Sequence, residues 1–178
     1  MFVNSVLTTG ISQACLADVP QLNALVNTAY RGPASKKGWT TEADLLDGLR
    51  IDEATLTAYI EDANSFILKY TNHAGGITAC VYLNVSSNKL YIGMLTVNPA
   101  LQNTGIGKLL LTAAENLARQ KHCHTLWMTV ITIRHELIAY YERKGFVVTG
   151  EKRPFPTETK FGIPKQPLEL LVMEKAVI

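Results

Sequence analysis

Cysteine is scarce in this sequence of 178 residues. The three cysteines, Cys15, Cys80 and Cys123, lie far apart and form no C-x-x-C pair. This spacing argues against a disulfide framework and favours reduced thiols in a cytoplasmic protein. Residues 1–6 also lack a basic segment followed by an apolar core, so we expect no signal peptide.

Long apolar runs and a charge excess are missing as well. No apolar stretch approaches ~18 residues, so we expect no membrane span. The net charge is only +2, and the basic residues are scattered, so nucleic acid is not an expected partner. Metal ligands are equally sparse. His122 and His124 flank Cys123 with no further ligand nearby in the sequence, and we expect no metal site.

Hydrophobic residues, by contrast, are plentiful. They make up 47% of the chain, against 18% for charged residues, which is typical of a globular protein with a substantial core. At this length we expect one domain over residues 1–178. No internal repeat or low-complexity tract divides the chain.

The hydrophobic pattern predicts both helices and strands. Helices are expected over residues 19–30, 53–60, 106–121 and around Tyr141, with one more beginning at Thr40 or Thr41. Strands are expected over residues 11–15, 66–70, 77–85, 90–97, 125–130, 146–151 and 168–175. Residues 32–38 and 153–167 are predicted to be loops. The strands between residues 66 and 97 form an antiparallel meander, which gives a mixed α+β fold.

One stretch organises the rest of the chain. Residues 95–110 have the pattern of a strand, a glycine loop and a helix, because the apolar run stops at Pro99 and helical spacing begins at Ile106. The helix start leaves N–H groups without partners, and Gly105 and Gly107 have no Cβ to keep a ligand away. The helix dipole adds positive charge there, as does Lys108. The loop is therefore suited to phosphate oxygens.

Two common phosphate loops do not fit. A Walker A loop requires Gly at position 102 and Ser or Thr at 109, and a dinucleotide fingerprint requires a third Gly at 110. The sequence has Gln102, Leu109 and Leu110 there. The pattern that fits is Q/R-x-x-G-x-G/A, which resembles the acetyl-CoA pyrophosphate loop of the GNAT superfamily of N-acetyltransferases. Its residues here are Gln102, Asn103, Thr104, Gly105, Ile106 and Gly107.

A second motif follows downstream. Residues 136–146 are similar to the family's A-x-x-[FY]-Y-E-x-x-G-F segment, a short helix closed by Gly145 and followed by Phe146. Together the two motifs extend the resemblance over about residues 60–176. The resemblance implies the GNAT fold, in which helices flank a central, mostly antiparallel twisted sheet.

The resemblance also implies a reaction, namely direct transfer of an acetyl group from acetyl-CoA to a primary amine on a small molecule or peptide. Residues 102–108 would bind the pyrophosphate. Leu95, Thr96 and Val97 would align the pantetheine, with a backbone N–H holding the oxyanion. Tyr141 would protonate the leaving thiolate, although a packing role in the core stays open. Because this fold often pairs through its last strands, a homodimer also stays open.

The general base departs from the family pattern. Many relatives carry a Glu on the strand before the glycine loop, whereas residues 90–94 contain no acid. The alternatives are a water chain that ends on Tyr91 and an acid from elsewhere, for which Glu42 is the candidate. The competing interpretation of Glu42 is a first-turn helix acid that serves the helix dipole.

The acceptor pocket is expected near aromatic residues in predicted loops. Trp39, Phe155 and Phe161 are such residues, and exposed rings in loops require a reason. Covering the core is an equally good reason. Arg134 stands where many relatives have a smaller polar residue, and either contacts CoA, contacts an acidic substrate group or starts the helix.

Two other kinds of function remain open. The missing strand acid fits a catalytically silent module that binds or senses acyl-CoA. The glycine loop could also be only a turn, which would suit an interaction protein. Thiol release with a panel of amines separates the first from an enzyme, and thermal stabilisation by CoA tests the second.

Overall fold

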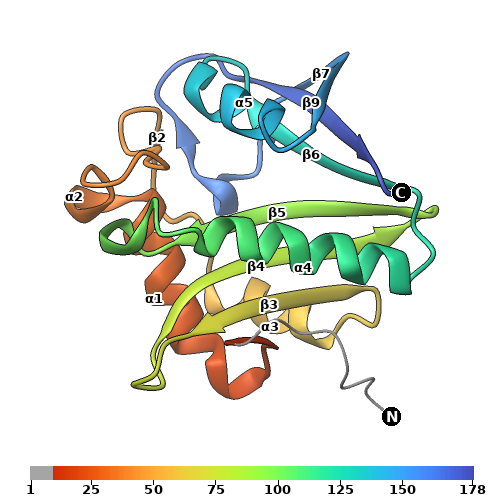
Figure 1. Cartoon of the computed structure of the whole chain (residues 1–178). Coiled ribbons are helices and arrows are strands. Elements are labelled where there is room, and N and C mark those ends of the chain that lie inside the picture. The colour runs from red at the N-terminus through yellow and green to blue at the C-terminus, as the bar shows by residue number, and fades with distance from the viewer. Residues whose placement is uncertain (1–9) are drawn as a thin grey trace.

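The computed structural model describes residues 10–178. The expectation of no signal peptide concerns residues 1–6, which lie outside the described residues. One sheet contains most of the strands, namely β1 (Ile11–Gln13), β3 (Ser65–Thr71), β4 (Ile77–Ser86), β5 (Lys89–Val97), β6 (Thr125–Ile131), β7 (Val147–Pro154) and β9 (Glu169–Ala176). This seven-stranded sheet has the order β1-β3-β4-β5-β6-β9-β7 and is antiparallel except where β5 meets β6 (Figure 1).

Helices cover both faces of this sheet. They are α1 (Val19–Tyr30), α2 (Gly32–Ser35), α3 (Glu53–Glu61), α4 (Ile106–Gln120) and α5 (His135–Glu142). In Figure 1, α4 lies in front of β4 and β5, whereas α1 and α3 lie behind the sheet. Within residues 10–178, no helix has both the length and the apolar composition of a membrane span.

The sequence pattern explains the two faces. Along β4, Ala79 and Val81 belong to the core under α4, while Cys80 between them belongs to the core under α1 and α3. This alternation follows from the period of two along a strand. On α4, the core-facing residues recur every three or four positions, as the sequence predicts; they are Ile106, Leu110, Ala113, Ala114 and Ala118.

The predicted meander is confirmed. Strands β3, β4 and β5 pair antiparallel in chain order. Asp52 caps α3, since its Oδ1 accepts a hydrogen bond of 2.7 Å from the Thr55 N–H. Asp18 precedes α1 but does not cap it. Its carboxylate instead accepts hydrogen bonds from the Cys15 N–H and the Lys69 ammonium.

Strands β5 and β6 pair over only three residues each. Residues 89–91 of β5 pair with residues 125–127 of β6, and beyond them the strands separate. A bulge accompanies the separation, because the register against β4 shifts between Gly93 and Thr96, and Met94 has a φ of 51°. The second half of β5 is thus left without a strand partner on its β6 side. Figure 1 shows the divergence.

Three local predictions were wrong. Residues 39–45 form turns and irregular backbone rather than a helix, since the Glu42 N–H pairs with the Tyr30 carbonyl and ties this segment to the end of α1. Residues 32–35 form the short helix α2 inside the predicted loop. The predicted loop 153–167 includes β8 (Ile163–Pro164), which pairs with β2 (Leu46–Asp47). Tertiary pairing between distant segments overrides local propensity at these places.

Candidate active site

The glycine loop borders a cavity of about 290 Å³. Its walls come from the end of β5, the start of α4 and one side of α5. The backbone N–H groups of residues 103–108 have no hydrogen-bond partner among residues 10–178. Gly105 has a φ of +91°, a left-handed conformation that favours glycine, and a Cβ there would meet open space. The loop therefore presents a row of free donors at the positive end of a helix.

The charges around this cavity fit an anionic ligand. Lys108 and Lys144 line it, and no Asp or Glu is among its lining residues. The free N–H groups and two lysines suit the diphosphate of coenzyme A. Gly107 serves a different purpose from Gly105, because a Cβ there would stand 3.3 Å from the Tyr140 hydroxyl.

The Gln102 side chain makes hydrogen bonds to other residues of the protein. Its Oε1 accepts a 3.0 Å hydrogen bond from the Trp39 N–H, and its Nε2 donates to Thr40 Oγ1 at 3.0 Å and to the Val97 carbonyl at 3.3 Å. Gln102 thus fastens residues 39–40 over the glycine loop. Trp39, expected in the acceptor pocket, lies instead on the wall of the glycine-loop cavity, where its ring packs against Tyr140.

A second cavity of about 250 Å³ lies on the other side of β5. Both candidates for the general base, Glu42 and Tyr91, line it, as do Phe155 and Phe161, which were expected in the acceptor pocket. Its polar lining is dominated by tyrosines and arginines, and Glu42 is the one carboxylate among its lining residues. We refer to it as the acceptor cavity.

The two cavities share part of their walls. Tyr30, Leu95, Leu137 and Tyr141 line both. Leu95 is in the bulged part of β5, and its carbonyl accepts a 2.7 Å hydrogen bond from the Tyr30 hydroxyl. Of the three β5 residues expected to align the pantetheine, Leu95 and Val97 line the glycine-loop cavity, whereas the Thr96 side chain is fully buried and bonds the Met94 carbonyl.

Tyr141 has the properties of a proton donor. Its side chain is 8% exposed, and no residue between 10 and 178 hydrogen-bonds its hydroxyl. Burial raises the pKa of Tyr141 well above its ordinary value, and the neighbouring hydroxyls of Tyr30 and Tyr140 add to the shift. Tyr141 therefore keeps its proton at neutral pH.

Comparison with known proteins decides the family. The model of the acetyltransferase (GNAT) family matches residues 23–146. The chain belongs to the GNAT acetyltransferase family. No curated protein sequence matches it.

Solved structures support the GNAT fold. The ribosomal-protein-S18-alanine N-acetyltransferase from Escherichia coli is similar with a TM-score of 0.70 and 19% identity, over 94% of this chain and 92% of that chain. A ribosomal-protein-alanine N-acetyltransferase from Brucella melitensis gives 0.68 and 22%, over 93% and 98%. A GNAT acetyltransferase from Staphylococcus aureus gives 0.66 and 14%, over 94% and 98%. At such low sequence identities, the similarity to these structures shows a shared fold alone.

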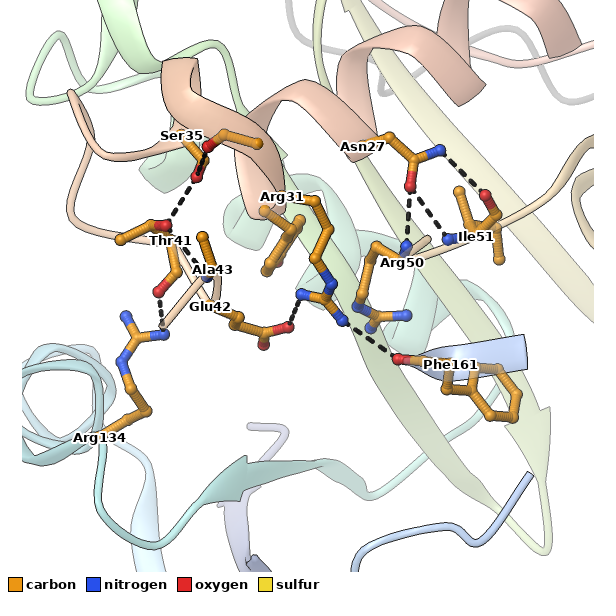
Figure 2. Close-up of polar contacts among 12 residues, drawn as sticks. Asn27, Arg31, Ser35, Thr41, Glu42, Ala43, Arg50, Ile51, Arg134 and Phe161 are labelled. Carbon is orange, nitrogen blue, oxygen red and sulfur yellow. Dashed lines mark hydrogen bonds and ion pairs between the residues drawn. The ribbon is translucent and has the colours of Figure 1, made fainter. Parts of the chain in front are cut away.

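Two of the charged residues that line the acceptor cavity of this GNAT site, Glu42 and Arg134, form ion pairs. Glu42 binds the Nη1 of Arg31, and their side chains are only 13% and 8% exposed (Figure 2). Arg134 is 6% exposed and donates to Glu136, to the Thr41 carbonyl and to the Trp39 carbonyl. Arg134 thus holds the segment between α2 and β2 in place. Glu42 is not in a helix, so its interpretation as a first-turn helix acid was wrong.

Several residues of the site escaped the sequence analysis. Tyr30, Arg50 and Tyr82 line the acceptor cavity, and Tyr140 and Lys144 line the glycine-loop cavity. A signal at α1 was available, because Asn23, Asn27 and Arg31, which directly follows the helix, recur every four positions beside a helix whose other face is apolar. Arg50 has no local signal, since it lies in an irregular segment.

Proposed function

We propose that this protein transfers the acetyl group of acetyl-CoA directly to a primary amine. The observation that carries the proposal is that Tyr141 lines both the glycine-loop cavity and the acceptor cavity. A donor in one cavity and an acceptor in the other would meet at this residue. The names of the Escherichia coli and Brucella structures, both N-acetyltransferases, support an amine as the acceptor.

Acetyl-CoA supplies a thioester carbonyl, and the protein supplies position and proton transfer. The N–H groups of residues 103–108, with Lys108 and Lys144, bind the diphosphate. The unpaired edge of β5 at Leu95 and Val97 aligns the pantetheine arm, and a backbone N–H in this bulged stretch stabilises the oxyanion that forms on attack. These roles use donors that have no partner among residues 10–178.

The acceptor must lose a proton before it attacks. An alkylamine with a pKa of ~10.4 is neutral about once in 10³ molecules at pH 7, which corresponds to a handicap of about 4 to 5 kcal/mol. We assign this proton to Glu42, the one carboxylate in the lining of the acceptor cavity, whose Oε1 has no partner among residues 10–178. Tyr91, whose ring also lines the cavity, is the competing route through water.

The covalent bonds of the acetyl transfer form and break at the wall that the two cavities share. The amine nitrogen forms a bond to the carbonyl carbon and loses its second proton to solvent, the carbon–sulfur bond breaks, and Tyr141 gives its proton to the sulfur. A thiol with a pKa of ~8.5 is a stronger acid than a phenol with a pKa of ~10, so transfer of the proton from Tyr141 to the thiolate is uphill by ~1.5 units, or about 2 kcal/mol. Solvent then returns a proton to Tyr141.

The test is thiol release from acetyl-CoA by purified protein across a panel of primary amines. Turnover with at least one amine, and an N-acetylated product by mass spectrometry, is the expected result. Thermal stabilisation by CoA without turnover would favour a silent acyl-CoA sensor. No stabilisation by CoA would favour an interaction protein whose glycine loop is only a turn.

A further inference from the structure

The lining of the acceptor cavity includes an arginine that has no ion-pair partner among the described residues. Three charged side chains line it: Glu42, Arg50 and Arg134. Glu42 pairs with Arg31 behind it, and Arg134 pairs with Glu136. The Arg50 guanidinium has no carboxylate and no hydrogen-bond acceptor among residues 10–178 (Figure 2). The cavity therefore keeps a net positive charge that the described residues do not neutralise.

Arg50 is nevertheless held firmly. Its backbone N–H donates a 2.7 Å hydrogen bond to Asn27 Oδ1, and Asn27 Nδ2 donates to the Ile51 carbonyl at 2.9 Å. Ile51 itself is 1% exposed and anchors the segment in the core beside α1. Figure 2 shows this clamp, in which the amide of Asn27 faces the Arg50–Ile51 backbone. Asn23 Nδ2 also donates to the Ile51 carbonyl at 3.2 Å, so two amide side chains of α1 fix this irregular segment.

The guanidinium is also charged and oriented. It lies over the Tyr30 ring, with Cζ 5.4 Å from the ring centroid. Burial lowers the pKa of Arg50, but the carboxylate of Glu42 and the hydroxyls of Tyr30 and Tyr91 raise it by more, so the net shift is upward. Tyr30 lines both cavities, so its contact with the guanidinium places Arg50 near the wall that the two cavities share.

A guanidinium in a cavity requires a partner. It offers a planar fork of N–H donors that matches a carboxylate in a bidentate arrangement. The Arg50 side chain is half-buried in the wall of the cavity, and no hydrogen-bond acceptor for its guanidinium is found among the described residues. We propose that the acceptor is a compact amine that also carries a carboxylate, and that Arg50 binds this carboxylate. This inference rests on the proposed acetyl transfer.

The size of the cavity supports a compact acceptor. Its volume of about 250 Å³ is just below the ~300–1,000 Å³ usual for small-molecule pockets, so an amino acid fits better than a bulky polycyclic amine. The amino group of a protein terminus has no carboxylate beside it. Such a terminus would leave Arg50 unpaired.

The experiment compares acceptors that differ only in the acid. Amino acids are assayed for acetylation beside their amides and the corresponding decarboxylated amines, and short peptides with free N-termini form a fourth arm. For the wild-type protein we expect a kcat/KM that is about 10- to 100-fold higher for the acids, the range typical of one hydrogen bond to a charged group. Arg50→Met should reduce this preference to about one, through KM for the acids, and should leave CoA affinity unchanged. Arg50→Lys should retain part of the preference.

Arg119→Met is the matched control, because this arginine on α4 is exposed and its polar contacts in the described part of the chain are with Asn116, Glu115 and the Ile178 carbonyl. It should keep the wild-type preference. Equal rates for acids and amides in the wild type, equal losses in Arg50→Met, or a preference for peptides would each overturn the inference while leaving acetyl transfer intact.

A binding arm separates the two proposals if no acceptor is turned over. Thermal stabilisation of the CoA-loaded protein is measured with N-acetylated amino acids and with their amides. Stronger stabilisation by the acids that disappears in Arg50→Met supports the carboxylate site even though the proposed reaction has failed. No difference between acids and amides refutes the carboxylate site.

Discussion

The ion pair between Arg31 and Glu42 joins the end of α1 to the wall of the acceptor cavity. Arg31 uses its second terminal nitrogen to donate to the Phe161 carbonyl at 3.1 Å, so one guanidinium holds two segments that border the cavity (Figure 2). The pair is shielded from water, which gives Glu42 a structural role beside the catalytic one proposed for it.

Substitution of each partner separates these roles. Glu42→Gln and Arg31→Gln should both lower the free energy of unfolding, by about 3 kcal/mol, because each leaves a partly buried group unpaired. Only Glu42→Gln should also lower kcat, by about 10²-fold, since only Glu42 accepts a proton. Urea unfolding and steady-state rates at a temperature where both variants are folded provide the measurement. Equal losses of kcat would mean that Glu42 is structural alone.

Tyr141→Phe tests the proton donor. Without the hydroxyl, kcat should fall by about 10²-fold or more while the Kd for CoA stays the same, because the ring still fills its place in the core. The raised pKa of Tyr141 keeps the hydroxyl protonated at neutral pH, so wild-type turnover should show no loss from its ionisation below pH 10. Tyr91→Phe is the comparison variant. A Tyr141→Phe enzyme with wild-type kcat would contradict the assignment.

Gly105→Glu tests the diphosphate loop. The new carboxylate adds bulk and like charge next to the free N–H groups, so CoA binding should become undetectable by calorimetry. Gly75→Glu is a close control, because Gly75 has a φ of +84° in the β3–β4 turn and a Cβ there also meets open space. Both variants carry similar backbone strain, of about 1 to 2 kcal/mol, and only the first should lose CoA. Tight CoA binding by Gly105→Glu would refute the loop assignment.

Asp18→Asn tests the ion pair between Asp18 and Lys69 of β3. Burial raises the pKa of Asp18, but the hydrogen bonds from Lys69 and from the Cys15 N–H together lower it by more. The pKa of Asp18 in the folded state therefore lies below its value in the unfolded state. The stabilisation is therefore present at neutral pH and is lost as pH falls through the acid range below about 4. The variant should lose about 1.5 kcal/mol at pH 7 and show a weaker pH dependence of unfolding between pH 5 and 2.

Asp44→Asn is the control for this measurement. Asp44 also pairs with a lysine, Lys36, but both side chains are largely exposed, so its removal should leave the unfolding free energy at pH 7 unchanged within error. If the Asp18 and Asp44 variants behave alike, burial of the Asp18 pair is not what makes it stabilising.

Much of the fold follows from local patterns in the sequence. The apolar spacing of α4, the Asp52 cap of α3 and the alternation along β4 each depend on residues within a few positions of one another. The failed helix at residues 39–46 shows the limit of this reasoning. Its propensity is real, but the Glu42 N–H pairs with Tyr30 and the Trp39 N–H with Gln102, and both contacts come from elsewhere in the chain.

The candidate site likewise has one part that could be predicted from the sequence and another part that could not. The sequence alone determined the glycine loop and its free donors, because backbone conformation around Gly105 and the start of a helix are local properties. Only the tertiary structure decided which charges near the acceptor cavity have partners. Arg134 and Arg50 cannot be ranked from the sequence, yet one is bonded to Glu136, Thr41 and Trp39, whereas the other has no acceptor among residues 10–178. Pairing of charges depends on distances between segments that are far apart in the chain, and these distances exist only once the sheet and its helices have packed.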